Sequence, residues 1–464
     1  MTQARDEIVS DSVCGDQRSI GVWGGSAIVA GNMIGVGIFL MPGLVADRTG
    51  TTISFLLVWA IGGLWALCGA LSFAELATMY PRAGGDYVYL RKAYGRSWAF
   101  VSGWVALLVT FSGSIAVMAG LTMKYQAPTL LGDWVSNEIV GFGQGAFSLS
   151  ITGSHLLAVL LIGLLTWINH RNIRWTAGFQ VGVTAIALLM MLVIIGGVYG
   201  LLTGEVVLPA QAPSIWPSAS VLALAFLPVY FAYAGWNAVS YVAGEVDRPN
   251  RNLPLSLILG TLVVTVVYVM ICFAYTLAVP VSSMGQVFNV GTAAASLFLH
   301  DLAGPVVDLL IIIAVAGSLN ATILSGSRIY LAMARDRSFF SFAGRIHPKY
   351  KTPTHSLWLQ AAWASLLVFI STVETILDYA VTLMLVLSIM SVGAVIVLRL
   401  KCPAAKRPYR CWGYPLTPLV YIGISLLVLW GAFLREPAYG AWIGIGVGAL
   451  GMALYWLVFR GRYR

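Results

Sequence analysis

The chain has 464 residues, of which 59% are hydrophobic and only 10% are charged. A soluble globular domain carries about 25% charged residues, so this composition excludes that class and predicts an all-α integral membrane protein. The formal net charge is +9, but the positions of the basic residues, given below, leave no reason to expect a nucleic-acid partner.

Twelve apolar segments follow one another along the chain, as its length allows at about 20 residues per spanning helix. Before them, residues 1–18 form a polar tail that lacks the basic start of a secretory signal, and residues 460–464 close the chain. The apolar segments are 20–46, 53–80, 98–123, 154–169, 177–202, 218–243, 254–279, 305–334, 355–373, 375–398, 415–434 and 439–459.

Lys and Arg are divided unequally between the connecting segments. With the N-terminal tail in the cytoplasm, 23 of the 27 lie in cytoplasmic segments and 3 in outer loops, while Arg328 lies within the eighth apolar segment. This excess predicts a cell-membrane protein with both termini in the cytoplasm and with basic loops facing anionic lipid. Arg328 is expected to extend toward the inner membrane interface.

The first apolar segment contains a glycine-rich block, Gly31-Asn32-Met33-Ile34-Gly35-Val36-Gly37-Ile38-Phe39. Each glycine weakens a helix by about 1 kcal/mol relative to alanine. A broken helix at mid-membrane depth is tolerated where it lines a cavity or is buried in protein. The block therefore predicts either a break with free backbone groups or close helix packing through small residues.

The first cytoplasmic loop, residues 81–92, contains Gly84-Gly85 followed by an amphipathic run that begins at Asp86. The pattern predicts a short helix at the membrane surface. A structural role is favoured for it over a functional one.

A second interruption occurs in the sixth apolar segment, where Pro228 removes a backbone donor and Gly235 loosens the chain one to two turns later. Each interruption lies in the first segment of a set of five, and the odd number makes the second set enter the membrane from the opposite face. Interrupted helices at matching positions of two inverted halves indicate a transporter binding site. The predicted units are an inverted repeat of 19–202 and 218–400, and accessory helices in 415–459 that serve packing or a homodimer.

A broken helix offers free amides at one end of the break and free carbonyls at the other. An α-amino acid presents a carboxylate and an ammonium, which suit these two ends. The carboxylate is expected at the amides around Gly35, Val36 and Gly37. The ammonium is expected at the carbonyls near Met33, Phe231 and Ala234, with the neighbouring aromatic side chains as walls or a lid.

Ionisable residues are missing from the middles of the first and the third to seventh apolar segments. Such residues are the usual proton relays and counter-ions for cations, so the pattern argues against a cationic substrate and a side-chain proton carrier. No nucleophile–base pair, phosphate loop or metal cluster is recognisable, and the five cysteines are scattered. The sequence therefore predicts no enzyme activity, no cofactor and no metal.

Four blocks at regular order and spacing resemble the amino acid–polyamine–organocation transporters, over about residues 18–400. They are the glycine-rich block, Phe73-Ala74-Glu75-Leu76 with Gly84-Gly85, Phe231-Ala232-Tyr233-Ala234-Gly235-Trp236-Asn237 with Glu245, and Gly317-Ser318-Leu319-Asn320 with Arg328. The chain is most similar to the L-type branch, which exchanges large neutral amino acids. The resemblance implies twelve transmembrane helices in a LeuT-type 5+5 inverted repeat, with discontinuous helices one and six and two accessory helices.

The resemblance also implies site residues. Phe231 stands where the family has its gating aromatic residue, and Asn237 matches an asparagine of the L-type branch. Asn32 and Ser114 match positions that line the pocket of the related arginine/agmatine antiporter, and Thr322 is a candidate wall residue. The full expected binding set is Asn32, Met33, Gly35, Val36, Gly37, Ser114, Phe231, Ala232, Ala234, Asn237 and Thr322.

Two departures from the family pattern matter. Many relatives carry a lysine in the fifth helix that takes the place of a sodium ion, whereas here the matching position is Ala187. Animal L-type proteins use a cysteine after helix three to bind a glycoprotein heavy chain, and residues 125–153 contain none. No disulfide-linked heavy chain is therefore expected.

The sequence thus predicts a secondary transporter that exchanges neutral L-amino acids by alternating access. Proton-coupled symport is the alternative within this class. A membrane sensor that binds amino acids without transporting them is the alternative from another class.

Overall fold

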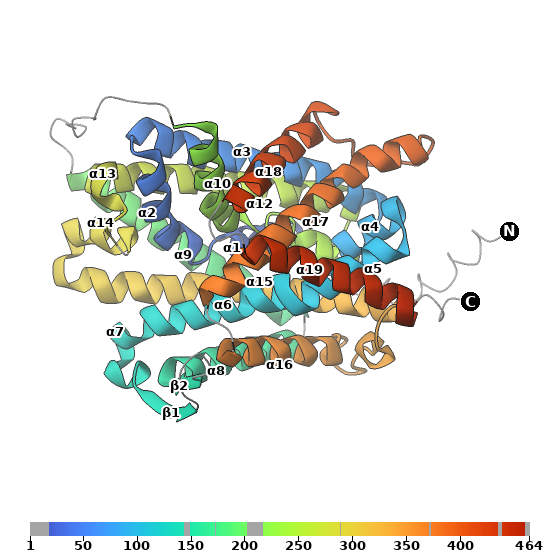
Figure 1. Cartoon of the computed structure of the whole chain (residues 1–464), viewed down its shortest axis with the longest axis horizontal. Coiled ribbons are helices and arrows are strands. Elements are labelled where there is room, and N and C mark those ends of the chain that lie inside the picture. Colours follow the sequence, from blue (N-terminus) through green and yellow to red (C-terminus); the bar gives the residue numbers. More distant parts are fainter. Residues whose placement is uncertain are drawn as a thin grey trace.

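The computed structural model describes residues 18–142, 149–171, 173–201, 217–287, 289–370, 373–434 and 439–459. Within these ranges the chain is built almost entirely from helices (Figure 1). The helices are α1 (Val22–Met33), α2 (Gly37–Thr49), α3 (Thr52–Met79), α4 (Asp86–Tyr94), α5 (Arg96–Val105), α6 (Phe111–Tyr125), α7 (Ala127–Leu131), α8 (Gly153–Arg171), α9 (Ile173–Leu201), α10 (Ala219–Tyr233), α11 (Ala238–Tyr241), α12 (Pro249–Ala278), α13 (Val281–Met284), α14 (Val290–Leu299), α15 (Ala303–Arg335), α16 (Thr354–Ile370), α17 (Val373–Lys401), α18 (Leu416–Leu434) and α19 (Tyr439–Leu454).

Two short strands lie in the loop that follows α7. β1 (Glu138–Phe142) pairs antiparallel with β2 (Leu149–Thr152), with Gly141 opposite Ser150. Residues 143–148 of this loop lie outside the described ranges.

Each of the twelve predicted apolar segments coincides with a helix or a helix pair. By length and composition, eight helices of the described ranges could cross a membrane, or nine if the bent pair α1 and α2 forms one span. Shorter apolar helices, Ala219–Tyr233, Thr354–Ile370 and Trp442–Val458, fall on the remaining segments. The chain is therefore an all-α, multi-pass membrane protein, while twelve spans and the inverted repeat stay predictions.

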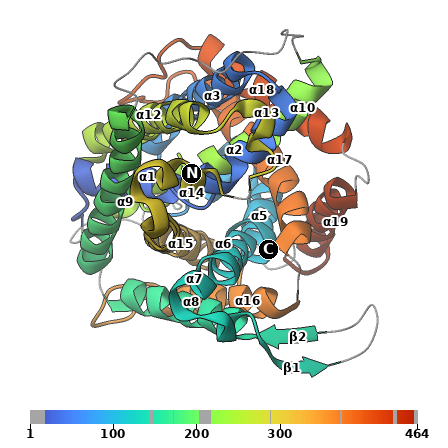
Figure 2. The ribbon, with the colours of Figure 1, turned by 90° about the vertical axis from the view of Figure 1, so that its left-hand side faces the viewer.

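The broken first span is enclosed by other helices. Viewed end-on in Figure 2, α1 and α2 lie toward the middle of the bundle. α1 packs against α9, α12 and α15, and α2 packs against α10. This enclosure is the setting in which irregular backbone is tolerated at membrane depth.

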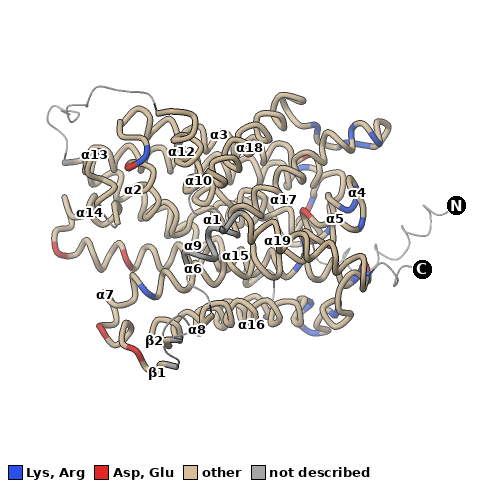
Figure 3. Tube along the Cα trace, viewed as in Figure 1, with Lys and Arg blue, Asp and Glu red and all other residues tan. Residues whose placement is uncertain are grey.

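Lys and Arg gather at one end of the bundle, the end at which α4 lies (Figure 3). The opposite end, near α7 and α14, carries acidic residues and few basic ones. The separation agrees with the unequal division of basic residues along the sequence. Which end faces the cytoplasm stays a prediction.

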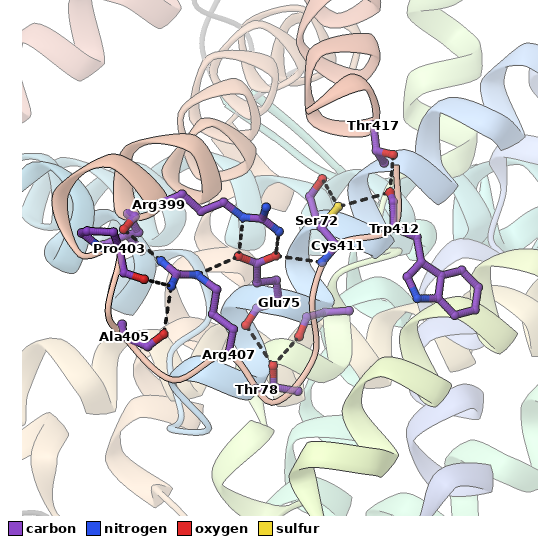
Figure 4. Close-up of polar contacts among 12 residues, drawn as sticks. Ser72, Glu75, Thr78, Arg399, Pro403, Ala405, Arg407, Cys411, Trp412 and Thr417 are labelled. Carbon is purple, nitrogen blue, oxygen red and sulfur yellow. Dashed lines mark hydrogen bonds and ion pairs between the residues drawn. The ribbon is translucent and has the colours of Figure 1, made fainter. Parts of the chain in front are cut away.

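A buried ion network joins α3 to α17 and to the loop that follows α17 (Figure 4). Glu75 on α3 is 1% exposed, pairs with Arg399 at 2.6 Å and with Arg407 at 3.3 Å, and accepts a hydrogen bond of 2.8 Å from the Cys411 amide. Two cations and one amide therefore compensate the single buried carboxylate, as burial of a charge requires.

The expectation that Arg328 extends to the inner interface is wrong. Arg328 on α15 is 1% exposed and pairs with Glu245 at 2.9 Å, and its second nitrogen donates to the carbonyl of Leu324. Glu245 ends a short 3-10 helix, Ala243–Glu245, which places its carboxylate beside the guanidinium. A partner within reach removes the reason for the side chain to seek solvent.

Candidate functional site

The first apolar segment is broken, as the glycine-rich block predicted. α1 ends at Met33 and α2 begins at Gly37, and the two helices are bent by 45°. Ile34 is extended, with φ −77° and ψ 99°. The break is narrower than the block, since it comprises only Ile34, Gly35 and Val36.

Gly31 shows the other behaviour that the block allowed, close packing. It lies inside α1, and a Cβ atom there would lie 2.0 Å from Nε2 of Gln180 and 2.4 Å from Oγ1 of Thr184. A Cβ at Gly35 would instead lie 3.4 Å from the Ser318 side chain, an ordinary contact. Both interpretations of the block are therefore correct, for different glycines.

The second interruption also lies in the sixth apolar segment. α10 continues through Pro228 and ends at Tyr233, and α11 begins at Ala238. Gly235, between the two helices, has φ 105°, a conformation that favours glycine. The break therefore depends on Gly235 rather than on Pro228.

The two breaks lie against each other. A Cβ at Gly37 would lie 2.7 Å from the Cα of Ala232, and one at Gly235 would lie 2.9 Å from Cγ of Asn32. Tyr268 on α12 donates a hydrogen bond of 2.7 Å to the Met33 carbonyl, and its hydroxyl also lies 3.3 Å from the Ala232 carbonyl. The backbones of the two broken spans are therefore in close contact at the breaks.

Free backbone groups remain at both breaks. Within the described ranges, the amides of Gly35 and Val36 make no hydrogen bond, and no side chain caps the N-terminus of α2. The Ala234 carbonyl is likewise without a donor in those ranges. The Met33 carbonyl, expected to be free, already accepts from Tyr268, and the Phe231 carbonyl accepts from the Ala234 amide at 3.2 Å.

One cavity of about 120 Å³ lies between the breaks, and all eleven predicted site residues line it. Their function in binding stays a prediction, but the structure brings them together from five separate helices and both breaks. The cavity also has lining residues outside the expected binding set, namely Asp86, Thr110, Phe111, Met118, Tyr230, Gly235, Trp236, Tyr241, Ser318, Met384, Leu387, Ser388 and Tyr421.

Hydrogen bonds orient Asn32 at the edge of the first break. Thr322 on α15 donates to its Oδ1 at 2.9 Å, and Ser318, one turn earlier, donates to its backbone carbonyl at 2.8 Å. The amide side chain is therefore held between α15 and Gly235 of the second break. Phe231 lies across the cavity and is partly exposed.

Asp86 is the lining residue that the sequence interpretation missed. It was assigned to a surface helix, yet α4 packs against α5, α15 and α17, and Asp86 begins α4 at the cavity. The predicted short helix is present, and its place at the membrane surface stays a prediction; its first residue follows Gly84 and Gly85, both at positive φ, and reaches the cavity. A signal was available: Asp86, Leu90 and Ala93 have helical spacing, which puts Asp86 on the buried face.

The Asp86 carboxylate is part of a chain of hydrogen bonds that leads to the second break. Tyr241 on α11 donates its hydroxyl hydrogen to Oδ2 of Asp86, and Asn237 donates to the Tyr241 oxygen at 3.1 Å. Burial raises the pKa of Asp86 to about 6, against the opposing effect of the hydrogen bond from Tyr241. The cavity therefore contains a carboxyl that titrates near neutral pH.

The junction of α1, α9 and α15 is held by neutral side chains. Thr184 donates to the Ala27 carbonyl at 3.2 Å, Asn320 donates to Gln180 at 2.7 Å, and Asn169 donates to Asn320 at 2.8 Å. Ala187 lies on α9 two turns after Gln180 and is buried. Its equivalence to the lysine of relatives stays a prediction, but the side chains described at this junction carry no charge.

Comparisons with known proteins give one consistent result. A family of amino acid permeases matches residues 20–455. The chain is 29% identical to the serine/threonine exchanger SteT of Bacillus subtilis over 449 residues, covering 95% of this chain and 97% of that protein.

Two mammalian relatives show similar agreement, each over 95% of this chain. Identity is 30% to the large neutral amino acids transporter small subunit 2 of Homo sapiens, covering 80% of it, and 28% to the Asc-type amino acid transporter 1 of Mus musculus, covering 81% of it. These relatives are transporters rather than enzymes. The chain therefore belongs to the amino acid permease family, within the superfamily of transporters that its motifs resemble, and is an amino acid transporter.

Proposed function

We propose that this protein exchanges neutral amino acids across the cell membrane, one for another, by alternating access. The observation that carries the proposal is the pair of opposed breaks, with free amides at Gly35 and Val36 and a free carbonyl at Ala234 on one cavity. Helix N-termini attract anions, so the start of α2 suits the carboxylate of the substrate. The carbonyl of Ala234 suits its ammonium group.

The size of the cavity favours a small substrate. An apolar cavity of about 150 Å³ holds benzene, and the cavity here measures about 120 Å³. The names of the relatives describe exchange of serine and threonine and transport of large neutral amino acids. Serine and threonine fit the smaller volume, and their uncharged side chains need no counter-ion in the cavity.

The proposed cycle follows from the predicted architecture. Residues 19–202 and 218–400 form the two inverted repeats, 415–459 the accessory helices, and both termini face the cytoplasm. The first, second, sixth and seventh spans rock against the third, fourth, eighth and ninth, with Phe231 as the gate over the substrate. The lack of cysteine in residues 125–153 favours function without a disulfide-linked heavy chain, and a homodimer through α18 and α19 stays a prediction.

Counterflow into proteoliposomes tests this function. Purified protein is reconstituted, the vesicles are loaded with unlabelled L-serine or left empty, and uptake of radiolabelled L-serine is followed at equal pH on both sides. Loaded vesicles should take up label several times faster than empty ones. Leucine, lysine and glutamate inside the vesicles report specificity, and the two charged amino acids should not accelerate uptake.

Three other results would contradict exchange. Uptake that ignores internal serine but follows a pH gradient would establish proton symport, the alternative that Asp86 makes chemically possible. Stabilisation of the purified protein by serine without any uptake would establish a sensor, because a ligand raises apparent stability by mass action. If no neutral amino acid either stabilises the protein or is taken up, the binding site itself would be contradicted.

A further inference from the structure

The cavity contains one carboxylate, Asp86, which is connected to the second broken span. Its Oδ2 atom accepts a hydrogen bond from Tyr241 on α11, and Tyr241 in turn accepts one from Asn237, just before α11. Asn237 and Tyr241 also line the cavity. The carboxylate at the start of α4, a helix that packs against α5 and α17, is thus bonded to the short helix beyond the break.

The groups that face Asp86 do not neutralise it. The groups that interact with it are the phenol of Tyr89 on α4 itself, the phenols of Tyr230, Tyr241 and Tyr421 on other helices, and the hydroxyl of Ser391. In the elements packed against α4, the cations are engaged elsewhere or exposed: Arg328 pairs with Glu245, Arg399 pairs with Glu75, Lys401 donates to the Ala93 carbonyl, and Arg96 and Arg335 are exposed. Within the described ranges Asp86 makes no ion pair.

Two protonation states of Asp86 are therefore accessible near neutral pH. Burial without a cation favours the neutral form and raises its pKa to about 6, whereas the N-terminus of α4 favours the charged form. The two states differ in how firmly they hold Tyr241, because a carboxylate accepts a stronger hydrogen bond than a carboxylic acid does. Protonation should loosen α11.

We propose that Asp86 is a proton-binding site of the transport cavity, which holds α11 through Tyr241 when deprotonated and releases it when protonated. The proton comes from water in the cavity and stays on the carboxyl group, while Tyr241 keeps its own hydroxyl hydrogen. The proposal rests on the proposed exchange function, since it assumes that α11 moves during the cycle. Exchange should accordingly become faster as the pH falls, by roughly fivefold between the two limiting states.

Counterflow of radiolabelled L-serine, measured at equal internal and external pH from 5 to 8, tests the proposal. The wild-type rate should rise with acidification through a midpoint near 6. Asp86→Asn should remove the pH dependence, and Asp86→Glu should retain one. Tyr241→Phe should move the midpoint to higher pH, because a hydrogen bond that favours the charged carboxylate is lost.

Asp308→Asn is the matched control, since Asp308 is a buried carboxylate on α15 that does not line the cavity. It should leave the wild-type pH profile unchanged. A profile that persists in Asp86→Asn, or a midpoint that does not move in Tyr241→Phe, would overturn the proposal. If Asp86→Asn does not fold, the midpoint of Tyr241→Phe decides the question.

The two proposals fail differently. Wild-type exchange at a rate independent of pH would overturn the role of Asp86 and leave exchange intact. Wild-type vesicles that show no acceleration by internal serine at any pH would contradict exchange itself, and the proton site in the transport cavity would fall with it.

Discussion

Gly35 and Gly37 lie two residues apart but differ in the space that a Cβ atom would have. A Cβ at Gly37 would lie 2.7 Å from the Ala232 backbone, whereas one at Gly35 would meet only the Ser318 side chain at 3.4 Å. Gly37→Ala should therefore force the two broken spans apart, at a cost of about 1–3 kcal/mol. Gly35→Ala should leave the folded protein nearly unchanged.

The thermal midpoint of the purified protein in detergent measures both effects. We expect a clear decrease for Gly37→Ala and little change for Gly35→Ala. Equal midpoints in the two variants would mean that α2 and α10 do not pack as closely as the structure has them.

Phe231 lines the cavity beside the second break and is the proposed gate. Phe231→Ala should lower the maximal rate of serine exchange while leaving the thermal midpoint close to the wild-type value, because a partly exposed side chain contributes little to the core. Exchange kinetics and the thermal midpoint are measured on the same preparation.

Phe226 provides the control, one turn earlier on the same helix. It is 5% exposed and packs edge-on against Trp65, away from the cavity. Phe226→Ala should cost about 3–5 kcal/mol of stability, as deletion of a buried aromatic side chain does. The gating role of Phe231 would be disproved by exchange at the wild-type rate in Phe231→Ala.

At the scale of elements, Glu75 fastens the end of α17 and its following loop to α3. Glu75→Gln would leave Arg399 and Arg407 without their anion. Removing one partner of a buried ion pair costs about 3–5 kcal/mol. The low end of that range applies here because the Arg399 side chain is 23% exposed.

The pair of Arg91 and Asp336 is the comparison, since its side chains are 31% and 24% exposed. Asp336→Asn should cost less than about 1 kcal/mol, as is usual for pairs near the surface. Thermal midpoints should therefore rank wild type, Asp336→Asn and Glu75→Gln in decreasing order. The reverse order of the two variants would show that the buried network is not a structural clamp.

The broken elements were predictable from sequence because glycine acts locally on the backbone. The glycine-rich block at residues 31–39 and Gly235 in the sixth segment predicted the two breaks, and the structure has a break at each. The sequence could not tell that Gly31 serves packing, because its neighbours Gln180 and Thr184 lie about 150 residues away. Likewise, the place of Asp86 on the cavity was missed because the turn at Gly84 and Gly85, and the helices that cover α4, depend on tertiary contacts.

For the whole molecule, the apolar segments and the unequal distribution of basic residues could be predicted from the order of residues along the chain. Arg328 was the exception: its burial depends on Glu245, which lies 83 residues away. The eleven predicted site residues line one cavity, but that result relied on motifs shared with a family as well as on the chemistry of broken helices. The volume of the cavity and the position of the Asp86 carboxylate on it could not be predicted from the sequence, because both depend on tertiary packing.

The central claim is that the two broken spans hold an amino acid between their free backbone groups. An experimental structure of the purified protein with L-serine, at a concentration that saturates exchange, tests it most directly. We predict that the substrate carboxylate lies at the amides of Gly35 and Val36, and its ammonium at the carbonyl of Ala234. Serine bound elsewhere, or continuous helices through residues 34–36 and 234–237 with serine bound, would contradict the claim.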